Sequence, residues 1–208
     1  NGIARLKEEY GFTEVEFRRF LTSSVISQLH EEVFWNNLTM LQTEFNFKKK
    51  ELKKLVTPEL ATCAGNAEIF VVLRKIRADW EMTTPDYLKF VRKMGVLYHV
   101  MDEKFIAALE SLRLDKGRAF SAEDMIRFMN SGTTLRLHKE SFWEDVDKFC
   151  SMFEFGKCEL LKTMNGCVAS RLENESFWVG IEKVKTTLRL SNKECVSFFS
   201  QAALAQHI

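Results

Sequence analysis

Apolar residues recur along the chain with a period of 35 to 37 residues. Three copies of the pattern open on an aromatic pair, at Phe34-Trp35, Phe142-Trp143 and Phe177-Trp178. Weaker copies open at Ile69-Phe70 and Phe105-Ile106, so the starts at 34, 69, 105, 142 and 177 are 35, 36, 37 and 35 residues apart. A fixed period of roughly 20 to 50 residues is typical of repeat proteins, which stack one supersecondary motif many times.

Each repeat begins with a helical pattern. Counting its leading residue as position 1, positions 5 and 8 are apolar in every copy and position 12 in all but the one that begins at Phe105. Residues with this spacing lie on one face of a helix, because the helix turns once in about 3.6 residues. The pattern therefore predicts a first helix that starts at position 1.

A second block of apolar residues at helical spacing follows, and it predicts the second helix of a hairpin. Its opening residues are Phe47, Met82, Phe120, Phe155 and Leu190. The same block at Phe12 adds one more repeat near the beginning of the chain. We expect an all-α solenoid of about six stacked helical hairpins, one array over residues 1–208 with repeats that begin near 1, 34, 69, 105, 142 and 177. Because the chain begins and ends inside predicted helices, we interpret it as a piece of a longer array.

An acidic residue recurs near the start of every second helix. In four repeats a hydroxyl side chain stands three residues before it, which gives the pattern Ser/Thr-x-x-Asp/Glu of a capping box. These hydroxyl residues are Thr13, Thr83, Ser121 and Ser191. The pattern explains the recurring carboxylate by helix capping rather than by catalysis.

Composition narrows the classes of function. The chain has two Pro and nine Gly, too few for a flexible linker, and no apolar run of the roughly 18 residues that a membrane span needs. Its five Cys form no Cys-x-x-Cys pair, and its four His fall in separate repeats, so we expect reduced thiols, no metal site and no cofactor. Phosphate-loop, zinc-helix and nucleophile-elbow motifs are missing, so we do not expect an enzyme.

Basic residues gather at positions 7 and 9 of the first helices, which hold eight bases and no acid. Position 9 shares a helix face with the Trp at position 2, and aromatic rings beside bases are typical of single-stranded nucleic-acid sites. The alternative is that the Trp rings pack against the next repeat while the long basic side chains extend past them. Packing is the favoured role for the Trp residues. The bases that we select as candidate RNA contacts are Lys75, Arg77, Arg113, Lys148, Lys183 and Lys185.

Repeats with starts rich in Phe and Leu and a Ser/Thr-x-x-Glu-Leu opening to the second helix resemble the octotricopeptide and heptatricopeptide arrays and the helical repeats that precede RAP domains. These arrays are related to the pentatricopeptide family. The resemblance covers the whole chain through a loose motif. It implies RNA binding, RNA processing or assembly into a ribonucleoprotein such as the mitochondrial ribosome, in a mitochondrion or a plastid.

Two functions remain open from the sequence. The first is an RNA-binding protein or ribonucleoprotein scaffold with RNA or ribonucleoprotein subunits as partners. The second is a protein–protein scaffold of armadillo or tetratricopeptide type, which needs no nucleic acid. A net charge of +1 is far from the strongly basic balance of most nucleic-acid-binding surfaces, and it favours the second.

Overall fold

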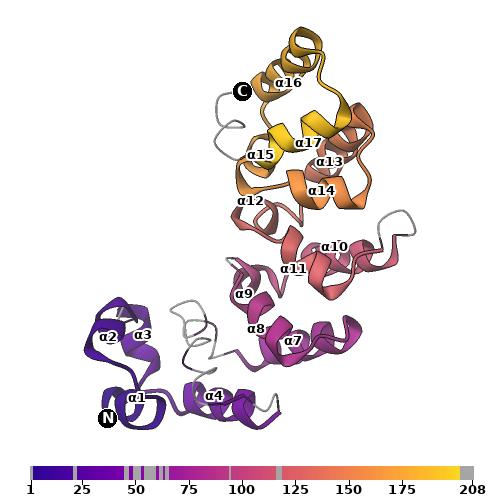
Figure 1. Ribbon diagram of the computed structural model, residues 1–208. Helices are drawn as coiled ribbons and strands as arrows, with labels where there is room; N and C mark the ends of the chain where they lie inside the picture. Colours follow the sequence, from indigo (N-terminus) through magenta and orange to yellow (C-terminus); the bar gives the residue numbers. More distant parts are fainter. Residues whose placement is uncertain are drawn as a thin grey trace. The chain divides into compact units, whose positions relative to one another are not determined.

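The computed structural model describes residues 2–20, 23–44, 47, 48, 53, 60, 63, 66–93, 95–115 and 119–201. Every regular element in these ranges is a helix, which confirms the predicted all-α class (Figure 1). Contacts divide the chain into two compact units. The first comprises Asn1–Arg92 and Val96–Met101, and the second comprises Lys93–Gly95 and Asp102–Ile208.

The first unit holds seven described helices. They are α1 (Gly2–Tyr10), α2 (Glu14–Phe20), α3 (Ser23–Gln28), α4 (Glu32–Glu44), α7 (Ala67–Asp79), α8 (Thr84–Val91) and α9 (Val96–His99). The second unit holds eight described helices, of which α12 packs on α15 and α14 packs on α17. They are α10 (Glu103–Leu114), α11 (Ala122–Phe128), α12 (Ser131–Thr134), α13 (Glu140–Phe153), α14 (Lys157–Thr163), α15 (Gly166–Arg171), α16 (Glu175–Leu188) and α17 (Asn192–Ser200). In these described parts, no helix has both the length and the apolar character needed to cross a membrane.

The predicted core face of the first helices is confirmed almost throughout. In α13, Phe142, Val146 and Phe149 are fully buried, and Phe153 is 1% exposed. Phe149 and Phe153 each lie 5.2 Å from Phe199 of α17, measured between ring centroids, so aromatic packing joins the two helices. Among the described residues at position 12, Leu188 is the exception, because its side chain is 56% exposed. Phe45 at this position lies outside the described residues.

The helices α7, α10, α13 and α16 begin two residues before position 1 of their repeats. In three of them a polar side chain accepts a hydrogen bond from a backbone N–H of the first turn. These N-cap residues are Asn66, Asp102 and Asn174. A side-chain oxygen at this position satisfies a donor that the helix itself leaves unpaired, so it sets where the helix starts.

The capping boxes are confirmed at the starts of the second helices. The Ser121 hydroxyl accepts from the backbone N–H of Asp124 at 3.1 Å, and the Asp124 carboxylate accepts from the Ser121 N–H at 3.1 Å. Ser191 and Glu194 make the same pair of bonds, at 3.4 and 2.8 Å. The Ser191 hydroxyl also donates to the Glu194 carboxylate at 2.6 Å, and this bond, followed by the one from the Ser191 N–H, lowers the pKa of Glu194. The other two hydroxyls, of Thr13 and Thr83, likewise accept from the backbone N–H three residues on.

The predicted second helix is wrong as a single element. In the second unit it is divided into two short helices, α11 with α12 and α14 with α15, with an Asn at each break. The side-chain oxygen of Asn130 accepts from Gly132 and Thr133 N–H, and that of Asn165 accepts from Cys167 and Val168 N–H. Each Asn therefore starts a new helix where the apolar spacing alone predicts continuation.

The same two Asn side chains also reach across one period. The Asn130 amide donates to the Met164 carbonyl at 2.9 Å, and the Asn165 amide donates to the Phe199 carbonyl at 2.7 Å. Both bonds join residues 34 positions apart. Beside the first of them, a Cβ added to Gly132 would lie 2.6 Å from the Gly166 carbonyl oxygen, so glycine is required where α12 meets α15.

Candidate nucleic-acid interface

The tryptophan of each Phe-Trp pair bonds the start of its helix to the turn before it. In each case the indole N–H donates to a backbone carbonyl six residues earlier. The bonds run from Trp35 to Leu29 at 3.1 Å, from Trp143 to Leu137 at 2.9 Å and from Trp178 to Leu172 at 2.7 Å. This recurring bond, with the burial of Trp35 and Trp178, confirms that the tryptophans pack within the protein.

Two position-7 bases lie over the tryptophan of the following repeat. The Arg5 guanidinium is 4.4 Å from the centre of the Trp35 ring, and the Lys148 ammonium is 4.2 Å from that of Trp178. A cation over an indole face is attracted by the negative charge density of the ring. Lys148, selected as an RNA contact, therefore already makes a contact within the protein.

The other selected bases fall into two groups. Arg77 donates to the Thr84 hydroxyl at 3.1 Å, Lys185 donates to the Met152 carbonyl at 2.6 Å, and Arg113 lies 3.9 Å from the Glu110 carboxylate. Lys75 on α7 and Lys183 on α16 are both exposed. Of the six residues, Lys75 and Arg77 belong to the first compact unit and the other four to the second.

A groove of about 520 Å³ lies in the second unit, along α10. Lys104, Ala107, Ala108 and Ser111 of α10 form one side of it. The turn before α13 and the first residues of that helix form the other side, with Leu137, His138, Lys139, Glu140 and Trp143. Sequence reasoning missed this groove because Lys104 and Lys139 fall outside positions 7 and 9.

A signal for the groove is nevertheless present in the sequence. Positions 3, 4 and 7 of the repeat that begins at Phe105 are Ala107, Ala108 and Ser111, all small residues. The next repeat has Glu144, Asp145 and Lys148 at the same positions. Small side chains on a helix face leave space where larger ones would fill it.

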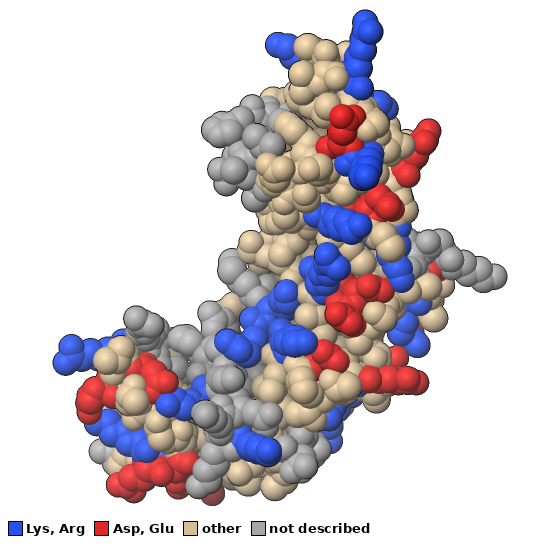
Figure 2. Space-filling model, in the orientation of Figure 1, with Lys and Arg blue, Asp and Glu red and all other residues tan. Residues whose placement is uncertain are grey.

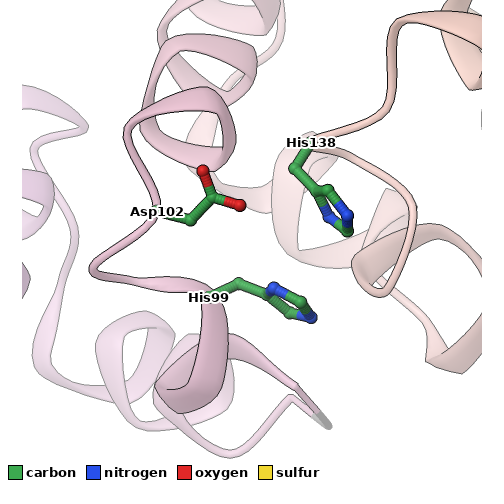
Figure 3. A group of neighbouring side chains, drawn as sticks. All are labelled: His99, Asp102 and His138. Atoms are coloured by element: carbon green, nitrogen blue, oxygen red, sulfur yellow. The ribbon is translucent and has the colours of Figure 1, made fainter.

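Two acidic side chains, Glu173 and Asp102, lie beside basic residues that line the groove. Glu173 accepts from the Lys139 ammonium at 2.9 Å, and this bond is the main cause of the lowered pKa of Glu173. Asp102, the N-cap of α10, has a carboxylate oxygen within 4.8 Å of a ring nitrogen of His138 (Figure 3). Figure 3 also draws His99, which ends α9 and belongs to the first unit.

The histidines lie at or just after the short helices. His99 occupies the last turn of α9, a position near the negative end of the helix dipole. His30 and His138 instead lie in the turns after α3 and α12, because the second helices are divided. His207 falls outside the described residues.

Charged side chains of both signs are interspersed over the face shown in Figure 2. This mixture agrees with the net charge of +1, because 30 bases are nearly balanced by 29 acids. The face shown therefore carries charges of both signs rather than one large basic field.

Comparisons with models of known protein families, with curated proteins and with solved structures give no match.

Proposed function

We propose that this chain is a non-catalytic helical-repeat protein that binds single-stranded RNA, alone or as a scaffold within a ribonucleoprotein. Its repeats would stack as a solenoid, which offers an extended surface for a long ligand. We propose a mitochondrion or a plastid as its compartment, in keeping with the resemblance to organellar repeat arrays.

The stacking is supported by polar bonds within the second unit that span about one repeat. The two Asn bridges join residues 34 positions apart, and so does the bond from Lys139 to Glu173. Lys157 reaches back 33 positions to the Asp124 carboxylate at 3.0 Å. Bonds that recur at the repeat spacing are expected when each repeat packs on the next.

The main observation in support of RNA binding is the exposure of Lys75 and Lys183. Both occupy position 7 of their first helices, and both are exposed. The same position holds Arg5 and Lys148, which lie over tryptophan rings instead. Lys75 and Lys183 are therefore the position-7 bases best placed to contact phosphate groups outside the chain.

A protein partner is the second candidate, and one observation favours it. Val71 and Val179 occupy position 3 of their first helices and are 56% and 62% exposed. Apolar side chains at equivalent exposed positions could pack against a helix of another protein. This function needs no excess of positive charge, in keeping with the balanced composition.

Fluorescence anisotropy with a labelled, mixed-sequence single-stranded RNA tests the proposal. We expect saturable binding that weakens steeply between low and physiological salt, because bound phosphates release counterions. In a Lys75→Ala/Lys183→Ala variant, the slope of log affinity against log salt should fall by about one for each lost contact.

Lys162→Ala is the matched control, because it removes one exposed positive charge from α14, away from the first helices. An equal loss of slope per charge in this control would remove Lys75 and Lys183 from the site. Failure of the unaltered protein to bind RNA at low salt would instead favour the protein scaffold.

A further inference from the structure

The groove along α10 is a place where a recurring contact is missing. In the α13–α16 pair, Lys148 at position 7 covers the Trp178 ring at 4.2 Å. In the α10–α13 pair, position 7 is Ser111, whose side chain is too short to cover Trp143. Within the described part of the chain, no Lys or Arg lies over the Trp143 ring.

The exposure of the two rings follows this difference. Trp178 is buried, with 8% of its surface exposed, whereas Trp143 is only half-buried. One face of Trp143 stacks on Phe128, with ring centroids 6.0 Å apart and an interplanar angle of 19°. The indole N–H is held by the Leu137 carbonyl, so the ring has a fixed orientation beside the groove. Trp143 therefore has a fixed orientation, and part of its surface lines the groove.

The charges that line the groove indicate which planar group fits. Lys104 and Lys139 are exposed residues of its lining, which also includes His138 and a single acid, Glu140. Lys139 also donates to Glu173 outside the lining, so Lys104 is the more available of the two ammonium groups. A cationic side chain from a protein partner would meet two ammonium groups there. A nucleotide suits the site better, because its base is planar and its phosphate is negative.

We propose that this groove seats one nucleotide of a single-stranded RNA, with the base stacked on Trp143 and a phosphate beside Lys104 and Lys139. The inference rests on the proposed RNA binding and specifies where one base is held. The small residues Ala107, Ala108 and Ser111 provide the space for the base. What distinguishes this groove is that position 7 lacks the Lys that covers the ring in the α13–α16 pair.

Ser111→Lys tests the site by rebuilding the contact that Lys148 makes with Trp178. The new ammonium would cover the Trp143 ring and exclude the base. We expect RNA affinity to fall about tenfold, since stacking on one aromatic side chain has about this effect. The change adds a positive charge, so electrostatics alone would strengthen binding, and a decrease must come from closing the groove.

Ser151→Lys is the control, because it adds the same charge at an exposed position of α13 that does not line the groove. Its affinity should equal or slightly exceed that of the unaltered protein. A Trp143→Phe variant should retain much of the affinity, because it keeps an aromatic ring. Thermal unfolding of each variant checks that a change in binding is not a loss of fold.

The outcomes separate the two proposals. Weaker binding by Ser111→Lys with unchanged binding by Ser151→Lys supports the groove. Equal RNA affinity in both variants and the unaltered protein overturns the groove but leaves RNA binding in place. No RNA binding by the unaltered protein overturns both. An arginine-rich peptide that binds at Trp143 when RNA does not would assign the groove to a protein partner.

Discussion

Two neighbouring helix pairs, α10 with α13 and α13 with α16, are built on one framework and differ in what covers a tryptophan. In both, the indole N–H donates to a carbonyl six residues earlier, at Leu137 and at Leu172. Asn130 lies before α13 and Asn165 lies before α16. Each caps a short helix and donates to a backbone carbonyl 34 residues later in the chain. Above this framework, Trp178 is covered by Lys148, whereas Trp143 lies at an open groove.

Comparing the two helix pairs distinguishes residues that stabilise the packing in both from a residue that differs between them. The Asn and Trp bonds satisfy groups within the protein, so their loss should cost stability at both places. The residue at position 7 contributes a weaker surface contact, so it can change from Lys to Ser and leave a site for a ligand. A functional surface in such an array is therefore sought where the recurring contact stops, as at Ser111.

The largest effect is expected at the Asn residues. Asn165→Ala removes the side-chain cap of α15 and the bond to the Phe199 carbonyl, and it should lower the free energy of unfolding by about 2 kcal/mol. Asn130→Ala should have the same effect, because Asn130 makes equivalent bonds. Urea unfolding followed by far-UV circular dichroism measures both.

Asn192→Ala is the control for this pair. Its amide donates to the Glu154 carboxylate at 3.2 Å on the surface, and removing that bond should change stability by less than about 0.5 kcal/mol. If Asn165→Ala costs no more than Asn192→Ala, the Asn bridge does not hold the framework together.

A smaller effect is expected from Trp178→Phe, which keeps an aromatic ring but removes the indole N–H. The buried Leu172 carbonyl then loses its donor, so stability should fall by about 1.5 kcal/mol. Trp143→Phe should cost less, because the bond to Leu137 is only partly buried. Trp80→Phe is the control, because Trp80 is also buried but its indole N–H has no hydrogen-bond partner among the described residues. Chemical denaturation of the three variants distinguishes the lost bond from the general loss of indole area. Equal losses at all three positions would contradict the role given to the N–H.

The sequence contained enough information to predict the helical class, the core face and the caps. Phe142, Val146 and Phe149 recur at a spacing that depends only on the turn of the helix, and Ser121 with Asp124 forms a local pattern. The Trp packing was likewise predicted as the favoured alternative. These features are set by residues close in sequence, so their interactions can be inferred without knowing the rest of the fold.

The divided second helix and the groove could not be predicted in the same way. Asn130 follows an apolar helical stripe, and its role depends on a carbonyl 34 residues away. The groove depends on side chains that are small, Ala107, Ala108 and Ser111, and on the ring that a later repeat places beside them. Both features depend on how one repeat packs on the next, and local sequence patterns do not reveal that packing.

The smallest effect is expected at the cation over Trp178, and it tests the comparison most directly. Lys148→Met keeps a long apolar side chain and removes the charge, so stability should fall by about 0.5 to 1 kcal/mol. Lys183→Met removes an exposed charge on α16 and should have almost no effect. If the two changes are equal, Lys148 does not stabilise the Trp178 ring, and the open face of Trp143 would not mark a missing contact. A loss confined to Lys148→Met means that a Lys at position 7 stabilises the tryptophan ring of the next repeat, and that Trp143 lacks this contact because position 7 is Ser111.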